Sequence, residues 1–365
     1  MRNVFKTSYD ADIRLFKHGA QAFWYALLLA LMLAMPLLIS SFLLGEVSGI
    51  LIWSIAGLGL MVLTGQAGQA SLGHTAFLAM GCYANTILMM KGVPFFISFP
   101  VAGLLAGLFG VIVAIPTLKL HGIYLAIFTL ALAVLIEDII VLSEPLTGGV
   151  TGLTSQTIKM FGLSFDRYAN PNAFYYLVLA TTLLVVLFYR NMLRSPLGRS
   201  FAAIRDSEIS AQAMGVNIAS TKAMAFFISC FITGLAGALI GQFSGAFNHE
   251  TFNLVIAIQL LLMIVVGGLG SIHGAFFGAI VVGAIPLGLS FLRDYIGKLS
   301  GAGSIAIPGL ESGIFGLILI GFILFEPMGI YGRWLKIRTY FELFPFYRRD
   351  MFRRNRSYLK TERMR

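Results

Sequence analysis

Residues 22–44 read AFWYALLLALMLAMPLLISSFLL, a run of 23 residues without a charged side chain. A helix needs roughly 20 apolar residues to cross the hydrocarbon core of a bilayer. Of the 365 residues in the chain, 58% are hydrophobic and only 12% are charged. Soluble domains carry about 25% charged residues. A single globular core could not bury so much apolar surface, so we predict an integral membrane protein.

Ten apolar stretches of this kind occur along the chain. They are residues 22–44, 47–63, 72–90, 94–118, 123–142, 173–189, 222–245, 254–268, 274–292 and 313–330. A helix satisfies its own backbone N–H and C=O groups, which lipid cannot do. The sequence therefore predicts an all-α integral membrane protein of about ten transmembrane helices. The two weakest stretches, 47–63 and 254–268, each lead into a glycine-rich segment.

The basic residues predict the orientation of these spans. Ten spans place both termini on one side. If that side is the cytoplasm, 21 of the 26 Lys and Arg residues lie inside and five lie outside. Such an excess is typical of cytoplasmic segments. We predict a cytoplasmic N-terminal segment (1–21), a transmembrane permease domain (22–332) and a basic cytoplasmic tail (333–365). Aromatic residues between the basic residues of the tail favour contact with membrane lipid and argue against nucleic acid.

The sequence contains no motif for catalysis or ATP binding. The phosphate-binding pattern GxxxxGK[ST], the zinc pattern HExxH and the nucleophile pattern GxSxG do not occur. Cys82 and Cys230 lie singly in apolar runs, without metal-ligand spacing. We therefore predict a transporter that is not an enzyme and binds no cofactor or metal. Its energy would come from another chain or from an ion gradient.

Two acidic residues, Glu137 and Asp138, lie about fifteen residues into the fifth apolar stretch. With that stretch running outward, they fall toward its external end. Three roles remain open for them. They are interfacial acids beside an external loop, groups that face the solute or a binding protein, or parts of a proton relay.

The cytoplasmic segment 190–221 contains the pattern of a short helix. Asp206 or Ser207 can cap the start of this helix, and Gly215 can end it in a left-handed conformation. The apolar residues that would share one face are Ile209, Ala213 and Met214. A helix this short is unstable in water by itself. It either rests on the lipid surface or docks into a groove of a cytoplasmic partner.

A series of motifs occurs in order between residues 50 and 290. They are GQAGQASLGHTAF (65–77) followed by Tyr83, YLAIFTL (124–130), LTGGVTGL (146–153), SPLGR (195–199), AMGV (213–216) and GGLGSIHG (267–274). Together they resemble the permeases of the branched-chain amino acid ABC importer family, in particular the LivM type. The family's fifth span carries an acid–x–x–Arg pattern, whereas this chain has Val134 and Glu137 at those positions.

The resemblance implies a permease of the cell inner membrane that pairs with a sister permease. Two cytoplasmic ATP-binding subunits and a periplasmic solute-binding protein would complete the importer. The solute would be a branched-chain amino acid, or else urea, a short amide or another amino or organic acid. An ion-coupled secondary carrier is the alternative from a different class.

The resemblance implies one group of functional residues, and the glycine-rich segments, the motif at 65–77 with Tyr83, and Glu137 suggest a second. The coupling helix that meets the ATP-binding subunits would include Asp206, Glu208, Ala211, Ala213, Met214 and Gly215. Candidates for the translocation path are Gly65, Gly68, Ser71, His74, Tyr83, Glu137, Gly267 and Gly270. The sequences LMVLTG (60–65) and LMIVVG (262–267) are alike. Their likeness is either chance or the mark of two matching irregular segments that flank the path.

Overall fold

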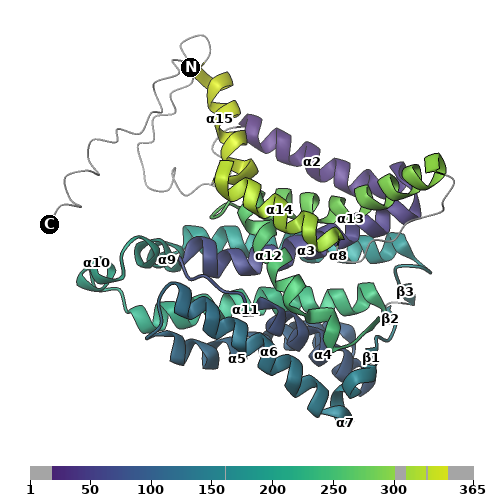
Figure 1. Ribbon diagram of the computed structural model, residues 1–365, viewed down its shortest axis with the longest axis horizontal. Coiled ribbons are helices and arrows are strands. Elements are labelled where there is room, and N and C mark those ends of the chain that lie inside the picture. The colour runs from purple at the N-terminus through teal and green to yellow at the C-terminus, as the bar shows by residue number, and fades with distance from the viewer. Residues whose placement is uncertain (1–18, 161, 301–309, 326–327, 344–365) are drawn as a thin grey trace.

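The computed structural model describes residues 19–160, 162–300, 310–325 and 328–343. These residues form a bundle of helices with short two-stranded ribbons at one end (Figure 1). Most of the predicted N-terminal segment and most of the predicted basic tail lie outside the described residues. Within them, the first helix begins at Gly19 and the last ends at Leu343.

Each of the ten predicted apolar stretches contains a helix. The long helices are α2 (Gly19–Leu38), α3 (Ser41–Leu60), α4 (His74–Met90), α5 (Phe95–Thr117), α6 (Ile123–Leu142), α8 (Pro171–Arg194), α11 (Ile218–Ser244), α12 (Leu254–Gly267), α13 (Ile272–Ser300), α14 (Leu310–Phe325) and α15 (Gly329–Leu343). In the described part of the chain, six helical segments are long and apolar enough to cross a membrane. An all-α membrane protein fits this architecture.

The boundary between the first two helices differs from the prediction. α2 ends at Leu38, and residues 41–44 already belong to α3, with Ser40 in an extended conformation between them. The apolar run hides this break because both helix ends are equally apolar. α3 continues into the π-helical segment η1 (Met61–Gln66), so the stretch that looked weak is part of a helical element of 26 residues.

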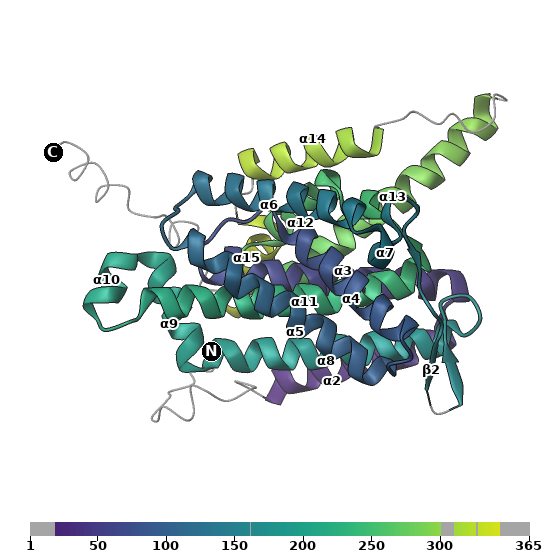
Figure 2. The same cartoon turned by 90° about the horizontal axis from the view of Figure 1, so that it is seen from below.

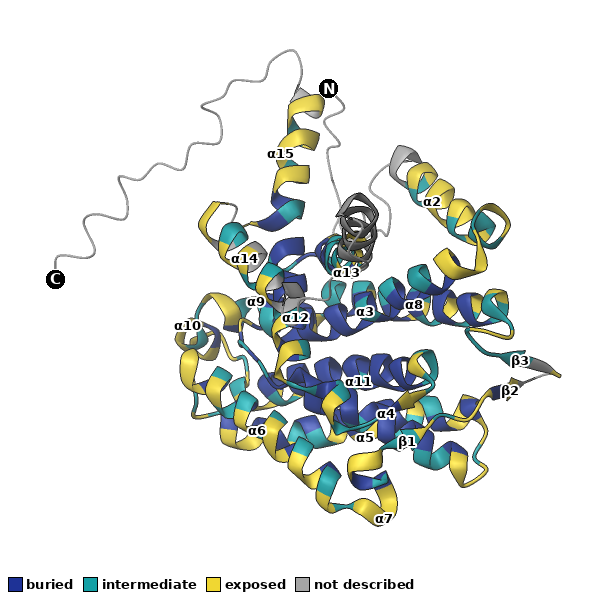
Figure 3. Cartoon of the chain, turned by 45° about the vertical axis from the view of Figure 1, so that its right-hand side comes forward, coloured by how far each residue is buried: buried dark blue, intermediate teal, exposed yellow. Residues whose placement is uncertain are grey.

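The helix α11 is the innermost part of the bundle. It packs against α3, α4 and α5, and Figure 3 shows most of it as buried. Glycines allow this close packing, because a Cβ atom at Gly237 of α11 would overlap the Leu78 carbonyl of α4. By contrast, α6 lies at the periphery, with most of its residues exposed or half-buried.

The two ends of the bundle carry different short elements. One end holds α7 (Glu144–Thr147), η2 (Gly149–Thr151), β1 (Leu153–Thr154), β2 (Ile158–Met160), β3 (Leu163–Phe165), β4 (Ala246–Phe247) and η3 (His249–Phe252). There β1 pairs antiparallel with β4, and β2 with β3. The other end holds α9 (Pro196–Asp206) and α10 (Glu208–Ala213) (Figures 1 and 2). We call these the ribbon end and the α10 end.

The predicted cytoplasmic segment 190–221 is therefore largely helical. Its short helix is confirmed as α10, whereas α9 was not predicted. α9 buries Gly198, Phe201 and Ile204 against the bundle. Its sequence, rich in basic and small residues, gives a weaker helical signal than the apolar spans.

Candidate functional site

The helix α10 begins and ends as its sequence suggests. The Ser207 hydroxyl accepts a hydrogen bond from the Ser210 N–H at 3.2 Å, so Ser207 caps the helix. Asp206 is instead the last residue of α9 and forms an exposed ion pair with Arg205 at 3.3 Å. Gly215 follows α10 with φ +87, a left-handed conformation that favours glycine. The turn after α10 thus reverses the chain toward α11.

One side of α10 is bare. Ile209 is 83% exposed and Met214 is 87% exposed. Ala213 is exposed as well, whereas Ala211 is buried against the bundle. The exposed apolar side chains lie at the α10 end of the molecule, on the six-residue helix and on Met214 directly after it. A helix this short needs a surface to pack on.

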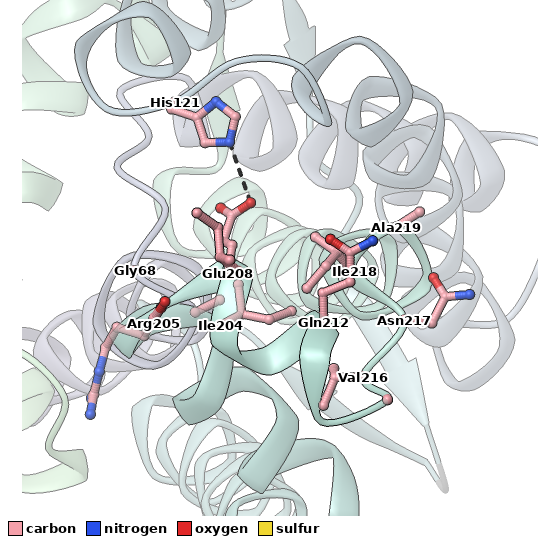
Figure 4. A pocket seen from close by; sticks show the side chains of 14 residues that line it. Gly68, His121, Ile204, Arg205, Glu208, Gln212, Val216, Asn217, Ile218 and Ala219 are labelled. Atoms are coloured by element: carbon pink, nitrogen blue, oxygen red, sulfur yellow. Dashed lines mark hydrogen bonds and ion pairs between the residues drawn. The ribbon is translucent and has the colours of Figure 1, made fainter.

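The Glu208 carboxylate joins three segments of the chain. Its Oε1 lies 2.8 Å from the Lys222 Nζ in the early part of α11. Its Oε2 lies 3.3 Å from the His121 Nε2, between α5 and α6 (Figure 4). Lys222 is only 1% exposed, whereas Glu208 is 31% and His121 is 65% exposed. Glu208 is thus directed toward the bundle.

A pocket of ≈ 920 Å³ lies beside this carboxylate. Its lining comes from α9, α10, the start of α11 and the segments around Gly68 and His121. In Figure 4 Glu208 points toward His121, whereas the Arg205 side chain points away from both. The pocket at the α10 end is thus lined by polar side chains and by apolar ones such as Ile204 and Ile218.

The two glycine-rich segments meet at the same end. The Gln66 side-chain amide donates to the Gly270 carbonyl at 3.0 Å, although 204 residues separate them. Arg205 of α9 donates from Nη1 to the Gly65 carbonyl at 3.3 Å. A Cβ atom at Gly68 would lie 2.8 Å from the Arg205 Cγ. The structure thus brings Gly65, Gly68 and Gly270 together around Arg205.

Gly267 lies next to this cluster, where α12 ends. A Cβ atom there would overlap the Gly274 carbonyl at the start of α13. In the turn between the two helices, the backbone at Gly267 therefore packs directly against the backbone at Gly274. Only glycine fits such an approach without moving the main chain.

Ser71 and His74 belong to a buried hydrogen-bond network instead. His74 Nδ1 lies 2.9 Å from the Ser71 hydroxyl, and His74 Nε2 lies 2.7 Å from the Ser229 hydroxyl of α11. Ser229 in turn donates to the Gly59 carbonyl of α3 at 2.6 Å. This network ties α4, α11 and α3 together inside the bundle.

Tyr83 and Glu137 lie apart from the glycine cluster. Tyr83 is buried near the ribbon end, with its ring 5.0 Å from that of Phe247 in an edge-to-face contact. Its hydroxyl has no hydrogen-bond partner among the described residues. Glu137 is half-buried on α6, beside the exposed Asp138. Neither carboxylate has an ion-pair partner in the part of the chain that the structure describes.

The sequence pattern of one known family covers most of the chain. The family described as "Branched-chain amino acid transport system / permease component" matches residues 42–323. The chain belongs to this permease family. The match includes α3 except its first residue, every helix from α4 to α13, and most of α14. It thus contains the glycine cluster and the α9–α10 segment alike.

Two branched-chain amino acid permeases are similar to this chain over most of their length, and a fructose permease is similar over a shorter part. The LivM permease protein of the high-affinity branched-chain amino acid transport system of Escherichia coli (strain K12) is 32% identical over 298 residues, which are 75% of this chain and 69% of that protein. The probable LivH permease protein of Methanocaldococcus jannaschii is 26% identical over 298 residues, 80% of this chain and 91% of that protein. The fructose import permease FrcC of Rhizobium meliloti is 35% identical over 143 residues, 37% of this chain and 38% of that protein. None of the solved structures matches this chain. The chain is a LivM-type permease component.

Sequence reasoning missed several residues of the α10 end. Lys222 and Arg205 were counted only among the basic residues that predict the membrane topology. Gln66 and His121 were given no functional role. A basic residue at the start of an apolar span, 14 positions after an acid, was the available signal for the pair Glu208–Lys222. Nothing in the sequence places Arg205 against Gly65.

Proposed function

We propose that this permease is the LivM-type membrane subunit of an ABC importer that carries branched-chain amino acids across the cell inner membrane. A sister permease, two cytoplasmic ATP-binding subunits and a periplasmic binding protein complete the proposed assembly. The family match and the names of the LivM and LivH relatives support this reading.

The observation that carries the proposal is the bare apolar side of α10. Ile209 and Met214 are among the most exposed large apolar residues of the described chain. Ile209 lies on α10 and Met214 directly follows it, and a helix this short gains stability from a further surface to pack on. We propose that an ATP-binding subunit supplies this surface, and that Asp206, Glu208, Ala211, Ala213, Met214 and Gly215 form the coupling element. Movement of the bundle by rigid-body alternating access would follow.

The proposed membrane topology has ten spans with both termini in the cytoplasm. The distribution of Lys and Arg supports it. The α10 end then faces the cytoplasm and the ribbon end faces the periplasm. Single cysteines placed at Ser210 and at Ser164 test this assignment. Only Ser164→Cys should react with a membrane-impermeant maleimide in intact spheroplasts, and labelling of Ser210→Cys would contradict the topology.

Glu137 and Asp138 support a second proposal, about the translocation path. Carboxylates inside a transmembrane span are costly and mark functional positions, and Glu137 and Asp138 lie toward the external end of α6. We propose that this part of α6 faces an aqueous path or the sister permease. Glu137→Gln should then change the KM for uptake more than it changes the amount of assembled importer. An unchanged KM would leave these residues as interfacial acids.

The solute class has one rival. The partial similarity to the fructose permease FrcC, and Val134 and Glu137 at family positions that carry an acid and Arg, favour a different small polar solute. The deciding experiment reconstitutes the complete importer in liposomes with ATP inside and binding protein outside. We expect uptake of leucine, isoleucine or valine that requires both. Uptake of urea, amides or fructose instead would favour the rival, and ion-driven uptake by the purified chain alone would show a secondary carrier.

A further inference from the structure

Lys222 is the most deeply buried charged residue among the described side chains with an ion pair. It lies in the second turn of α11 and is 1% exposed. Lysine is almost never fully buried unless it is paired, because removing an ammonium group from water is costly. The Lys222 ammonium therefore depends on a fixed partner.

That partner is the first residue of the short helix α10. The Glu208 Oε1 lies 2.8 Å from the Lys222 Nζ, and the second oxygen lies 3.3 Å from the His121 Nε2. A charge-assisted contact of this length is strong and directional. One carboxylate thus fixes α10 to α11 and to the segment between α5 and α6.

Few other contacts hold α10 in place. Of its six residues only Ala211 is buried, and the turn that follows contains Gly215 in a left-handed conformation. By contrast, α11 has 27 residues and packs against α3, α4 and α5. At 1.5 Å per residue it extends about 40 Å. The ion pair to Lys222 therefore links α10 to the helix that lies deepest in the bundle.

We propose that Lys222 is a positioning residue for transport: its ion pair with Glu208 makes α10 and α11 move as one body. Glu208 then acts inside the permease and does not bind an ATP-binding subunit. This inference rests on the proposed ATP-binding partners, because they are what would displace α10. A purely structural Lys222 would stabilise the fold without changing how much solute is moved per ATP.

The test uses the complete importer in liposomes and measures uptake, ATP hydrolysis and their ratio. The variants are Glu208→Gln, Lys222→Met, Lys222→Arg and the charge exchange Glu208→Lys with Lys222→Glu. Lys119→Gln is the matched control, because Lys119 is an exposed lysine between α5 and α6 with no part in this pair. Monodispersity and the thermal midpoint of each purified variant show that it is folded.

For Glu208→Gln and Lys222→Met we expect uptake per ATP to fall about tenfold, while the ATP-binding subunits still co-purify. Lys222→Arg keeps the charge and should retain most of the ratio. The charge exchange should recover it to within about threefold, because the opposite charges still face each other.

Three results would overturn the proposal. The first is a normal ratio in folded Glu208→Gln or Lys222→Met. The second is a charge exchange that is as uncoupled as either single change while it remains folded. The third is loss of the ATP-binding subunits from Glu208→Gln but not from Lys222→Met, which would place Glu208 on their surface. If the unaltered importer neither hydrolyses ATP nor transports, the proposed function fails, independently of Lys222.

Discussion

An ion pair lies at each end of α11, and the two pairs differ in how their cations are held. At the α10 end Lys222 is 1% exposed, and Glu208 is its ion-pair partner. At the ribbon end Arg167 is 20% exposed and lies 2.7 Å from Glu46 of α3. The Arg167 guanidinium also lies 3.8 Å from the centre of the Phe243 ring of α11. Arg167 therefore has a carboxylate, an aromatic face and some water.

This difference indicates where the molecule tolerates change. Loss of one partner at the ribbon end leaves Arg167 over an aromatic ring, a favourable position for a cation. Loss of Glu208 leaves a charge that water cannot reach, which is the costly case. The structure should therefore depend more on the ion pair at the α10 end, where α11 meets the proposed coupling element.

The largest expected effect is that of a side chain at Gly267. In Gly267→Leu the Cβ overlaps the Gly274 carbonyl, so the backbone of α12 and α13 must separate. We expect a loss of stability of about 3 kcal/mol and no uptake. Membrane insertion should persist, because leucine adds to the apolar character of the span. Thermal unfolding in detergent, membrane fractionation and uptake measure the three quantities.

Leucine at other glycines allows the stability cost at the α10 end to be compared with that at the ribbon end. At Gly45, near the ribbon end, a Cβ would lie 3.1 Å from the Arg167 Nε, a side-chain atom that can move. Gly45→Leu should therefore cost only about 1 kcal/mol. Gly65→Leu should fall between them, because its Cβ would lie 2.8 Å from the Gly270 N. Gly316→Leu on α14 is the control, with nothing within 4 Å. Full uptake by Gly267→Leu would show that the close backbone contact between Gly267 and Gly274 is not needed for transport.

The sequence predicted the elements of this arrangement better than their contacts. The length of each apolar run predicted a helix, so most of the helices were predictable. The cap at Ser207 was predictable because serine is a preferred residue at the start of a helix. The break at Ser40 was not, because the residues on both sides are equally apolar. An ion pair such as Arg167–Glu46 joins residues 121 positions apart. Which acid meets which base follows from how the helices pack, and composition and periodicity carry no such information.

The same limit applies to the candidate path. Gly65, Gly68 and Gly270 were chosen as glycines in interrupted spans, and the structure brings them together around Arg205. His74 was chosen from the same motif, yet it lies in a buried network with Ser71 and Ser229. A motif identifies residues that a family needs. It does not distinguish those that hold helices together from those that line a path.

The second prediction compares the acids of the two ion pairs. Glu208→Gln should lower the free energy of unfolding of the purified chain by about 2 kcal/mol, because Lys222 stays buried and charged without its counter-ion. Glu46→Gln should lower it by about 1 kcal/mol, because Arg167 keeps water and the Phe243 ring. Thermal unfolding of both variants in one detergent measures the difference.

Salt provides the control for this comparison. About 1 M KCl shortens the screening length to roughly 3 Å and weakens exposed pairs most. Added KCl should therefore reduce the effect of Glu46→Gln and leave that of Glu208→Gln nearly unchanged. Equal effects of the two substitutions, with equal salt dependence, would mean that the two ends are held alike.

The smallest expected effect on stability is that of alanine at two glycines with positive φ, and it distinguishes a loss of stability from a loss of coupling. Gly215, after α10, has φ +87, and Gly92, between α4 and α5, has φ +83. A Cβ atom at either position meets nothing within 4 Å, so alanine adds only backbone strain. Gly92 follows Met89, whose sulfur accepts from Gln242 beside Phe243, and so lies toward the ribbon end. Alanine at either position should therefore lower the stability by about 1 kcal/mol.

The two variants should differ in their effect on transport. If strain at α10 disturbs coupling, Gly215→Ala should reduce uptake per ATP about threefold, whereas Gly92→Ala with the same strain should not. Gly215→Pro should uncouple uptake more strongly, because proline excludes a positive φ. An equal loss of coupling in the two alanine variants would show that general stability, and not the position of α10, limits transport.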